Sequence, residues 1–311
     1  MALGLVLLSL IFIIVYFVLP GKIVVAQGIT ATGNQAALSR FLDVENNWKK
    51  WWPSHTESRS ADPGFLIRAG DFNFTKAGSV FNALEITIAA PDTAYKSFLY
   101  VLPVTPDSVN ISWTTTIVAS PALFGKIQLY FRAKEISTKL AGILEAMKKY
   151  IDDDKNIYGI KVRREKMALE YMASAKQVTD HEPTTRDIYS LIGQVKNYIS
   201  EIGATAYDYP LVNISTLDTL RWNLMVAVPV DKPVPTAGIF SEKRMLKNGN
   251  VLVTEVTGGK STIDAAWKQI AVYAADHQYL NMAIPYQQLV TDRMQVTDST
   301  KWVTRISFPI L

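Results

Sequence analysis

The second half of the sequence repeats one order of elements, strand–helix–strand–strand, and this repeat restricts the possible folds more than any other feature. The first copy consists of a strand over 167–178, a helix over 185–202 and strands over 210–215 and 221–229. The second copy consists of a strand over 250–256, a helix over 262–279 and strands over 284–291 and 301–309. The pattern predicts a duplicated β-α-β-β domain of the α+β class over residues 163–311.

Both predicted helices of the repeat are amphipathic. The first carries apolar residues at three- and four-residue steps from Ile188 to Ile202, and the second is expected to bury Ile263, Trp267, Ile270, Ala271 and Ala274. Each helix starts at a polar pair that can supply an N-cap oxygen. We therefore expect each helix to pack one face on the strands of its own copy.

The first half predicts a separate α+β unit over residues 22–157. A strand over 22–31 and an amphipathic segment over 35–47 precede strands over 80–88 and 109–117. In the last of these, Val109, Ile111, Trp113 and Ile117 share one face with Thr115, which is typical of a half-buried antiparallel strand. A long helix follows, with an apolar face that runs from Ile136 to Ile151. The charged stretch after it predicts a boundary between two independently folding units.

The first unit contains the motif Asn47-Trp48-Lys49-Lys50-Trp51-Trp52-Pro53. This motif and the order of elements resemble bacterial members of the SRPBCC superfamily, which has the START-like or polyketide-cyclase-type fold. The resemblance covers about 135 residues and implies a helix-grip fold, in which a curved antiparallel sheet wraps the long helix around a hydrophobic cavity. The alternative role of the three tryptophans is plain packing in the core and at its rim.

The second unit resembles the GyrI-like, or AraC-type effector-binding, domain. The residues that carry the resemblance are Gly193-Gln194-Val195-Lys196-Asn197-Tyr198-Ile199, Val226-Ala227-Val228-Pro229-Val230, Gly258-Gly259 before Trp267, and Trp302 to Pro309. Such domains bind small, often cationic and aromatic molecules between the two repeats. The resemblance therefore implies a pocket between the two copies of the repeat.

The sequence departs from that family in its penultimate strand. Gln287 stands where the family commonly has Glu, Leu289 where it has Tyr, and Arg293 where it has Pro. An amide retains a hydrogen-bond acceptor but loses the negative charge that favours a cation or serves as a general base. We therefore expect a pocket whose binding is nearly independent of ligand charge.

Four residues are candidates for the wall of this pocket: Trp222, Trp267, Gln287 and Leu289. An amide beside indole rings is the sparse polar group in an apolar wall that ligand pockets tend to contain. The alternative is that both tryptophans are ordinary core residues, since buried aromatic side chains usually only pack.

The N-terminal segment, residues 1–21, contains no charged side chain. Its apolar stretch from Ala2 to Leu19 would span about 27 Å as a helix, close to the hydrocarbon thickness of a bilayer. We expect a single transmembrane anchor in a bacterial inner membrane, with the side of the two domains left open because no Lys or Arg precedes the span. The alternative is a signal peptide cleaved near Ala26.

Composition excludes several kinds of chemistry. The 311 residues include no cysteine and only three histidines, which are far apart, so a metal site is not expected. No cofactor motif is found, and Gly259-Lys260-Ser261 is not a phosphate-binding loop because Thr254 occupies the position of its first glycine. The net charge of +4 without a basic cluster argues against nucleic acid as a partner.

These observations favour a membrane-tethered, non-catalytic protein that binds a small apolar or amphipathic molecule. Two alternatives remain open from the sequence: a hydrolase like some GyrI-like relatives, against which the Gln287 substitution counts, and an adaptor that uses these folds for protein contacts. The sequence does not indicate which protein partner such an adaptor would have.

Overall fold

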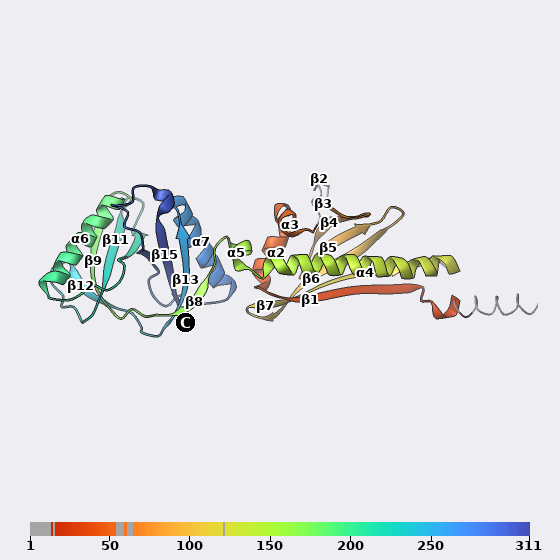
Figure 1. The fold of residues 1–311 in the computed structure, drawn as a ribbon, viewed down its shortest axis with the longest axis horizontal. Helices are drawn as coiled ribbons and strands as arrows, with labels where there is room; N and C mark the ends of the chain where they lie inside the picture. Colours follow the sequence, from red (N-terminus) through yellow and green to blue (C-terminus); the bar gives the residue numbers. More distant parts are fainter. Residues whose placement is uncertain (1–13, 15, 54–58, 61–64, 121) are drawn as a thin grey trace, which may run out of the picture. The chain divides into compact units, whose positions relative to one another are not determined.

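The computed structural model describes residues 14, 16–53, 59–60, 65–120 and 122–311, and it divides into two compact units, Met1–Asp153 and Asp154–Leu311. Each unit contains one antiparallel sheet and its own helices (Figure 1). The predicted α+β class is therefore confirmed. The short helix α5 (Asp154–Tyr158) falls almost wholly inside the predicted first unit, residues 22–157, but it belongs to the second unit and contacts its α7.

The first unit is a seven-stranded sheet in the order β1-β7-β6-β5-β4-β3-β2, with every neighbouring pair antiparallel. The strands are β1 (Lys22–Thr32), β2 (Arg59–Ser60), β3 (Phe65–Ala69), β4 (Phe72–Val80), β5 (Ala83–Ala89), β6 (Ala94–Thr105) and β7 (Ser108–Val118). The helices are α2 (Gln35–Asp43), α3 (Glu45–Trp51) and the long α4 (Leu123–Ile151), which packs along β1 (Figure 1).

Periodicity positions the core of this unit. The predicted inner face of β7 is buried at all five positions from Val109 to Ile117, and α4 buries the predicted stripe from Ile136 to Ile151. The strand expected over 80–88 instead starts at Ala83, because a turn at Phe81, which has a φ of 50°, separates it from β4.

The tryptophan motif forms part of this core. Trp48, Trp51 and Trp52 are all buried, and their ring centroids lie 5.0–5.9 Å apart. Trp52 contacts Phe74 at 5.3 Å, and Phe74 contacts Trp113 at 5.7 Å, so one aromatic cluster extends into the sheet. Packing is therefore the role that the structure gives to these tryptophans.

The second unit is an eight-stranded sheet in the order β12-β9-β11-β10-β14-β15-β13-β8. Its strands are β8 (Arg163–Lys166), β9 (Tyr171–Thr179), β10 (Leu211–Thr216), β11 (Trp222–Val230), β12 (Phe240–Arg244), β13 (Asn250–Thr257), β14 (Tyr286–Leu289) and β15 (Val303–Ile310). The helices are α6 (Thr185–Glu201) and α7 (Lys260–Asp276), with a short 3-10 helix at Ser299–Lys301.

The duplication is confirmed by the topology. β9-α6-β10-β11 and β13-α7-β14-β15 are two β-α-β-β copies, and they meet at the centre of the sheet where β10 pairs with β14. In this pairing Val212 lies opposite Gln287. Directly opposed residues point to the same face of a sheet, and Val212 packs in the cluster under α6. Gln287 therefore lies on the helix-bearing face.

Two predicted strands of this unit are wrong in extent. The strand expected over 167–178 begins only at Tyr171, as β9, because residues 167–170 cross the sheet from β8, which ends at Lys166 beside the second copy, to the first copy. The strand expected over 284–291 shortens to β14, since Pro285 has no N–H to donate and the N–H of Val290 turns back to the Gln288 carbonyl at 3.2 Å.

Within the part of the chain that the structure describes, no helix is both long enough and apolar enough to cross a membrane. Most of the expected span, Ala2 to Leu19, lies outside the described residues.

Candidate ligand-binding groove

A groove of about 580 Å³ lies between α6 and α7, over the central strands β10 and β14. Its walls come from residues just before and at the start of α6, from the first two turns of α7, and from residues 212–214 of β10. Pro285, which precedes β14, and Gln287, which lies in β14, also line it. Arg293 and Trp302 complete the lining. The volume falls in the range of about 300–1,000 Å³ that is usual for small-molecule sites.

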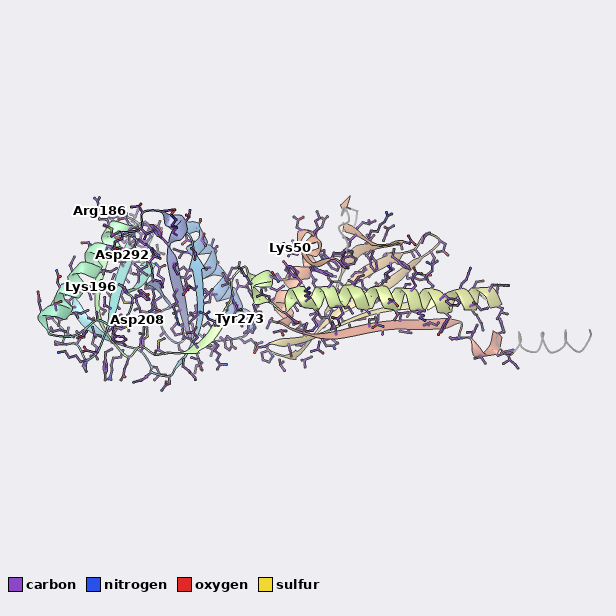
Figure 2. All side chains as sticks on the ribbon, in the orientation of Figure 1. Lys50, Arg186, Lys196, Asp208, Tyr273 and Asp292 are labelled. Atoms are coloured by element: carbon purple, nitrogen blue, oxygen red, sulfur yellow. The ribbon has the colours of Figure 1, made fainter. Side chains whose placement is uncertain are left out.

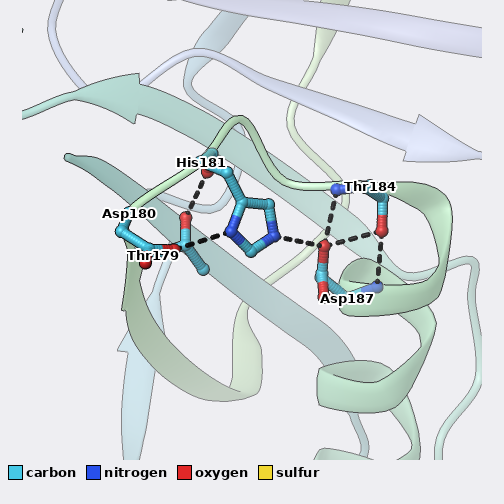
Figure 3. Close-up of polar contacts among 5 residues, drawn as sticks. All are labelled: Thr179, Asp180, His181, Thr184 and Asp187. Atoms are coloured by element: carbon cyan, nitrogen blue, oxygen red, sulfur yellow. Dashed lines mark hydrogen bonds and ion pairs between the residues drawn. The ribbon is translucent and has the colours of Figure 1, made fainter. Parts of the chain in front are cut away.

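Two helix N-termini contribute to the groove, and they are capped differently. The hydroxyl of Thr184 accepts a hydrogen bond from the Asp187 N–H, while the Asp187 carboxylate accepts one from the Thr184 N–H at 2.8 Å, which completes a capping box (Figure 3). The N-cap of α7 is Gly259, which has no side chain to supply a cap. The first turn of α7 therefore retains the positive end of its dipole without a side-chain acceptor.

His181 lies beside the start of α6, between two carboxylates. Its Nδ1 is 2.8 Å from Asp180 Oδ1, and its Nε2 is 3.3 Å from Asp187 Oδ2 (Figure 3). The hydrogen bonds to Asp180 and then to Asp187 raise the pKa of the imidazole above its ordinary value of 6.5. The Thr184 hydroxyl donates to the Asp187 carboxylate at 2.6 Å, so an imidazole does not activate this hydroxyl as a nucleophile.

Gln287 lies in the floor of the groove. The residue is only 8% exposed, and its Oε1 is buried without a hydrogen-bond partner among the described residues. Native proteins leave few buried polar atoms without a partner, so this oxygen makes Gln287 a candidate for contact with a molecule in the groove. Sequence reasoning placed Gln287 in the pocket, and the structure puts it in the lining.

The other sequence candidates divide between groove and core. Trp267 is half-buried on α7 and lines the groove. Trp222 begins β11 opposite Thr179 and is not among the lining residues, and Leu289 is buried in the core under α6. Ala271, expected on the buried face of α7, is exposed.

Trp302 and Arg293 are functional candidates that the sequence did not identify. Arg293 is only 8% exposed, its backbone N–H donates to the Tyr189 hydroxyl at 2.7 Å, and its Nη2 donates to Thr304 Oγ1 at 2.9 Å. Its Cζ lies 4.8 Å from the centroid of the Trp302 ring. Burial lowers the pKa of the Arg293 guanidinium. The only signal in the sequence was an arginine where the resembled family has proline.

The charged residues at the rim of the groove neutralise one another. Lys260 Nζ lies 3.0 Å from Glu182 and 2.7 Å from Asp264, and all three side chains are about half exposed. These two carboxylates are the only acidic residues in the lining. The remaining basic residues of the lining are Lys268 and Arg293.

A second, smaller pocket of about 250 Å³ lies on the opposite face of the sheet, with Met172, Met225, Met245 and Tyr286 in its wall. Two buried atoms of the groove lining, Gln287 Oε1 and Arg293 Nε, have no hydrogen-bond partner among the described residues, and neither residue lines this smaller pocket. Among the residues that the structure describes, no three His, Asp or Glu side chains form a cluster suited to a metal ion.

The chain is thus a two-unit α+β protein whose second unit is a duplicated β-α-β-β module with a groove between the helices of its two copies. No protein family and no curated protein matches the sequence.

Solved structures with similar folds include EcmrR in a complex with DNA, with 14% identity over 59% of this chain and 71% of that chain and a TM-score of 0.44. SAV2435 bound to tetraphenylphosphonium is 18% identical over 49% of this chain and 94% of that chain, with a TM-score of 0.31. A START superfamily protein from Mycobacterium smegmatis is 15% identical over 41% of this chain and 98% of that chain, with a TM-score of 0.29.

Proposed function

We propose that the second unit binds a small amphipathic molecule in the groove between α6 and α7. The observation that carries this proposal is a cavity of about 580 Å³ whose lining contains two buried polar atoms, Gln287 Oε1 and Arg293 Nε, without a hydrogen-bond partner among the described residues. Each unsatisfied buried group costs roughly 1–3 kcal/mol. The apolar body of such a ligand would pack against Trp267 and Ile188, and its polar head would form hydrogen bonds with Gln287 and Arg293.

Binding without turnover fits the chemistry of the lining better than catalysis does. Gln287 replaces the carboxylate of the resembled family, and an amide does not act as a general base at neutral pH. Near the groove, the Thr184 hydroxyl is held by a carboxylate. We therefore propose a receptor or carrier role rather than a hydrolytic one.

We also propose, from the sequence, that residues 2–19 tether this protein to a bacterial inner membrane. The support is the uncharged run of spanning length. Washing membranes with high-pH carbonate tests the tether: the full-length chain should stay in the pellet. Release of the intact chain, or a mature N-terminus after Ala26, would contradict it.

A groove-filling substitution tests the binding proposal. Thr185 is in the first turn of α6 and lines the groove, so Thr185→Trp should occupy part of the cavity. Lys196 is exposed on the same helix, outside the lining, and Lys196→Trp is the matched control (Figure 2).

The measurement is calorimetric titration of the full-length chain with the neutral aromatic 2-naphthamide, with circular dichroism to establish that each variant is folded. We expect binding to wild type and to Lys196→Trp and at least a tenfold loss in Thr185→Trp. Equal binding by all three proteins, or no binding of either 2-naphthamide or its carboxylate analogue 2-naphthoate to wild type, would contradict the groove as the site.

A further inference from the structure

We infer that the groove selects a small organic anion, an aromatic carboxylate being its simplest form, and that Arg293 binds the anionic head. This inference rests on the binding function proposed above and adds the charge of the ligand. It also revises the expectation from the sequence, because the loss of the family's carboxylate at Gln287 is accompanied by a buried positive charge in the same lining.

Arg293 is held in place by both copies of the repeat. Tyr189 of α6 accepts its backbone N–H, whereas Thr304 of β15 accepts its Nη2. The guanidinium faces the Trp302 ring at 4.8 Å, and that indole is itself anchored by a 2.7 Å hydrogen bond from its Nε1 to the Val296 carbonyl. The cation is therefore positioned before any ligand arrives, so little side-chain entropy is lost on binding.

Arg293 has no counter-ion within the described part of the chain. No carboxylate there forms an ion pair with it, and its Nε is buried without a hydrogen-bond partner. The two acidic residues of the lining, Glu182 and Asp264, both pair with Lys260 at the rim. Buried charges in proteins are normally paired, so an unpaired buried guanidinium in a cavity wall points to an anion from outside the chain.

Three features of the groove suit an amphipathic anion. The guanidinium presents a planar fork that matches a carboxylate. The uncapped N-terminus of α7 adds a positive dipole end to the same cavity. Trp267 and Ile188 offer apolar surface for the body of the ligand. A cation in the same place would meet the like charge of Arg293 in a poorly solvated site.

The test compares three ligands that share one apolar body: 2-naphthoate, 2-naphthamide and 2-naphthylmethylammonium. Each is titrated calorimetrically into the full-length chain. The readout is the ratio of the naphthoate and naphthamide affinities, in which any general uptake by the naphthyl body cancels. Charge-assisted hydrogen bonds predict a ratio of roughly 10- to 100-fold in favour of naphthoate, with the ammonium weakest.

Variants assign this ratio to Arg293. In Arg293→Gln the ratio should collapse to near one, and in Lys196→Gln, which removes one exposed charge of the same unit outside the groove, it should persist (Figure 2). Arg293→Lys keeps the charge without the fork and should give an intermediate ratio. If Arg293→Gln does not fold, the comparison of the naphthoate-to-naphthamide ratio between wild type and Arg293→Lys replaces it, and an unchanged ratio in Arg293→Lys would count against the role of Arg293.

The inference is overturned if wild type binds the amide or the ammonium as tightly as naphthoate, or if Arg293→Gln keeps the full ratio. The two levels of the proposal fail separately. Naphthamide binding that is lost in Thr185→Trp without any preference for naphthoate refutes only the anionic ligand, whereas naphthamide binding that survives in Thr185→Trp refutes the groove itself.

Discussion

Replacing Gln287 by methionine should stabilise the second unit. The Gln287 Oε1 is buried and makes no hydrogen bond in the described residues, so its removal breaks no bond and abolishes a desolvation cost of roughly 1–3 kcal/mol. Methionine has nearly the same length and adapts to its surroundings, so the repacking cost should stay below about 1 kcal/mol. We expect a net gain of about 1–2 kcal/mol.

Scanning calorimetry of the full-length chain measures this gain. For a unit of roughly 150 residues, 1 kcal/mol corresponds to a shift in Tm of about 2–4 °C, so one of the transitions should rise by about 2–8 °C. Gln288→Met is the matched control, because Gln288 is also buried in β14 but points to the other face, where its Nε2 lies 3.5 Å from Asp208 Oδ2.

The control variant should lower the same transition, since it leaves Asp208 without this donor. A loss of stability in Gln287→Met comparable to that in Gln288→Met would refute the reasoning, because it would mean that the Gln287 amide has a partner in the unliganded protein. A gain in stability together with weaker ligand binding is the trade-off expected of a residue kept for function.

Further predictions concern pH and domain structure. Hydrogen bonds to Asp180 and Asp187 raise the pKa of His181, so its contribution to stability is fully present below about pH 6.5 and is lost as pH rises through the raised pKa. The difference in urea midpoint between wild type and His181→Gln should therefore shrink from mildly acidic to mildly alkaline pH, and a pH-independent difference would contradict this. Separately expressed residues 22–153 and 154–311, a division that keeps α5 with α7, should each melt cooperatively, and an unfolded second fragment would refute that boundary.

Local periodicity made much of the fold predictable. The alternation in β7 and the apolar stripe of α4 each fix which face is buried from neighbouring residues alone, and the structure buries those faces. The duplicated order of elements was readable for the same reason. The break between β8 and β9 could not be predicted. Met167 and Leu169 are buried, as alternate residues of a strand would be, but they belong to the segment that crosses the sheet between the two strands.

The groove was predictable only in part. Gln287 could be placed because its strand matches a known order of elements. Trp302 lines the groove and Trp222 does not. This difference depends on the position of the loop before β15 and on where β11 begins, neither of which follows from a residue pattern. Arg293 could not be found from the sequence, because arginines are mostly exposed and its burial depends on contacts with both Tyr189 and Trp302.

Photo-crosslinking of the full-length chain with 4-benzoylbenzoate, an aromatic carboxylate that reacts with nearby C–H bonds when illuminated, tests the central claim most directly. Peptide mapping should place the adducts on the start of α6, on α7 near Trp267 and on the segment with Trp302, and excess 2-naphthoate should suppress them. Adducts confined to other parts of the chain, or adducts that 2-naphthoate does not diminish, would contradict a ligand site in the groove.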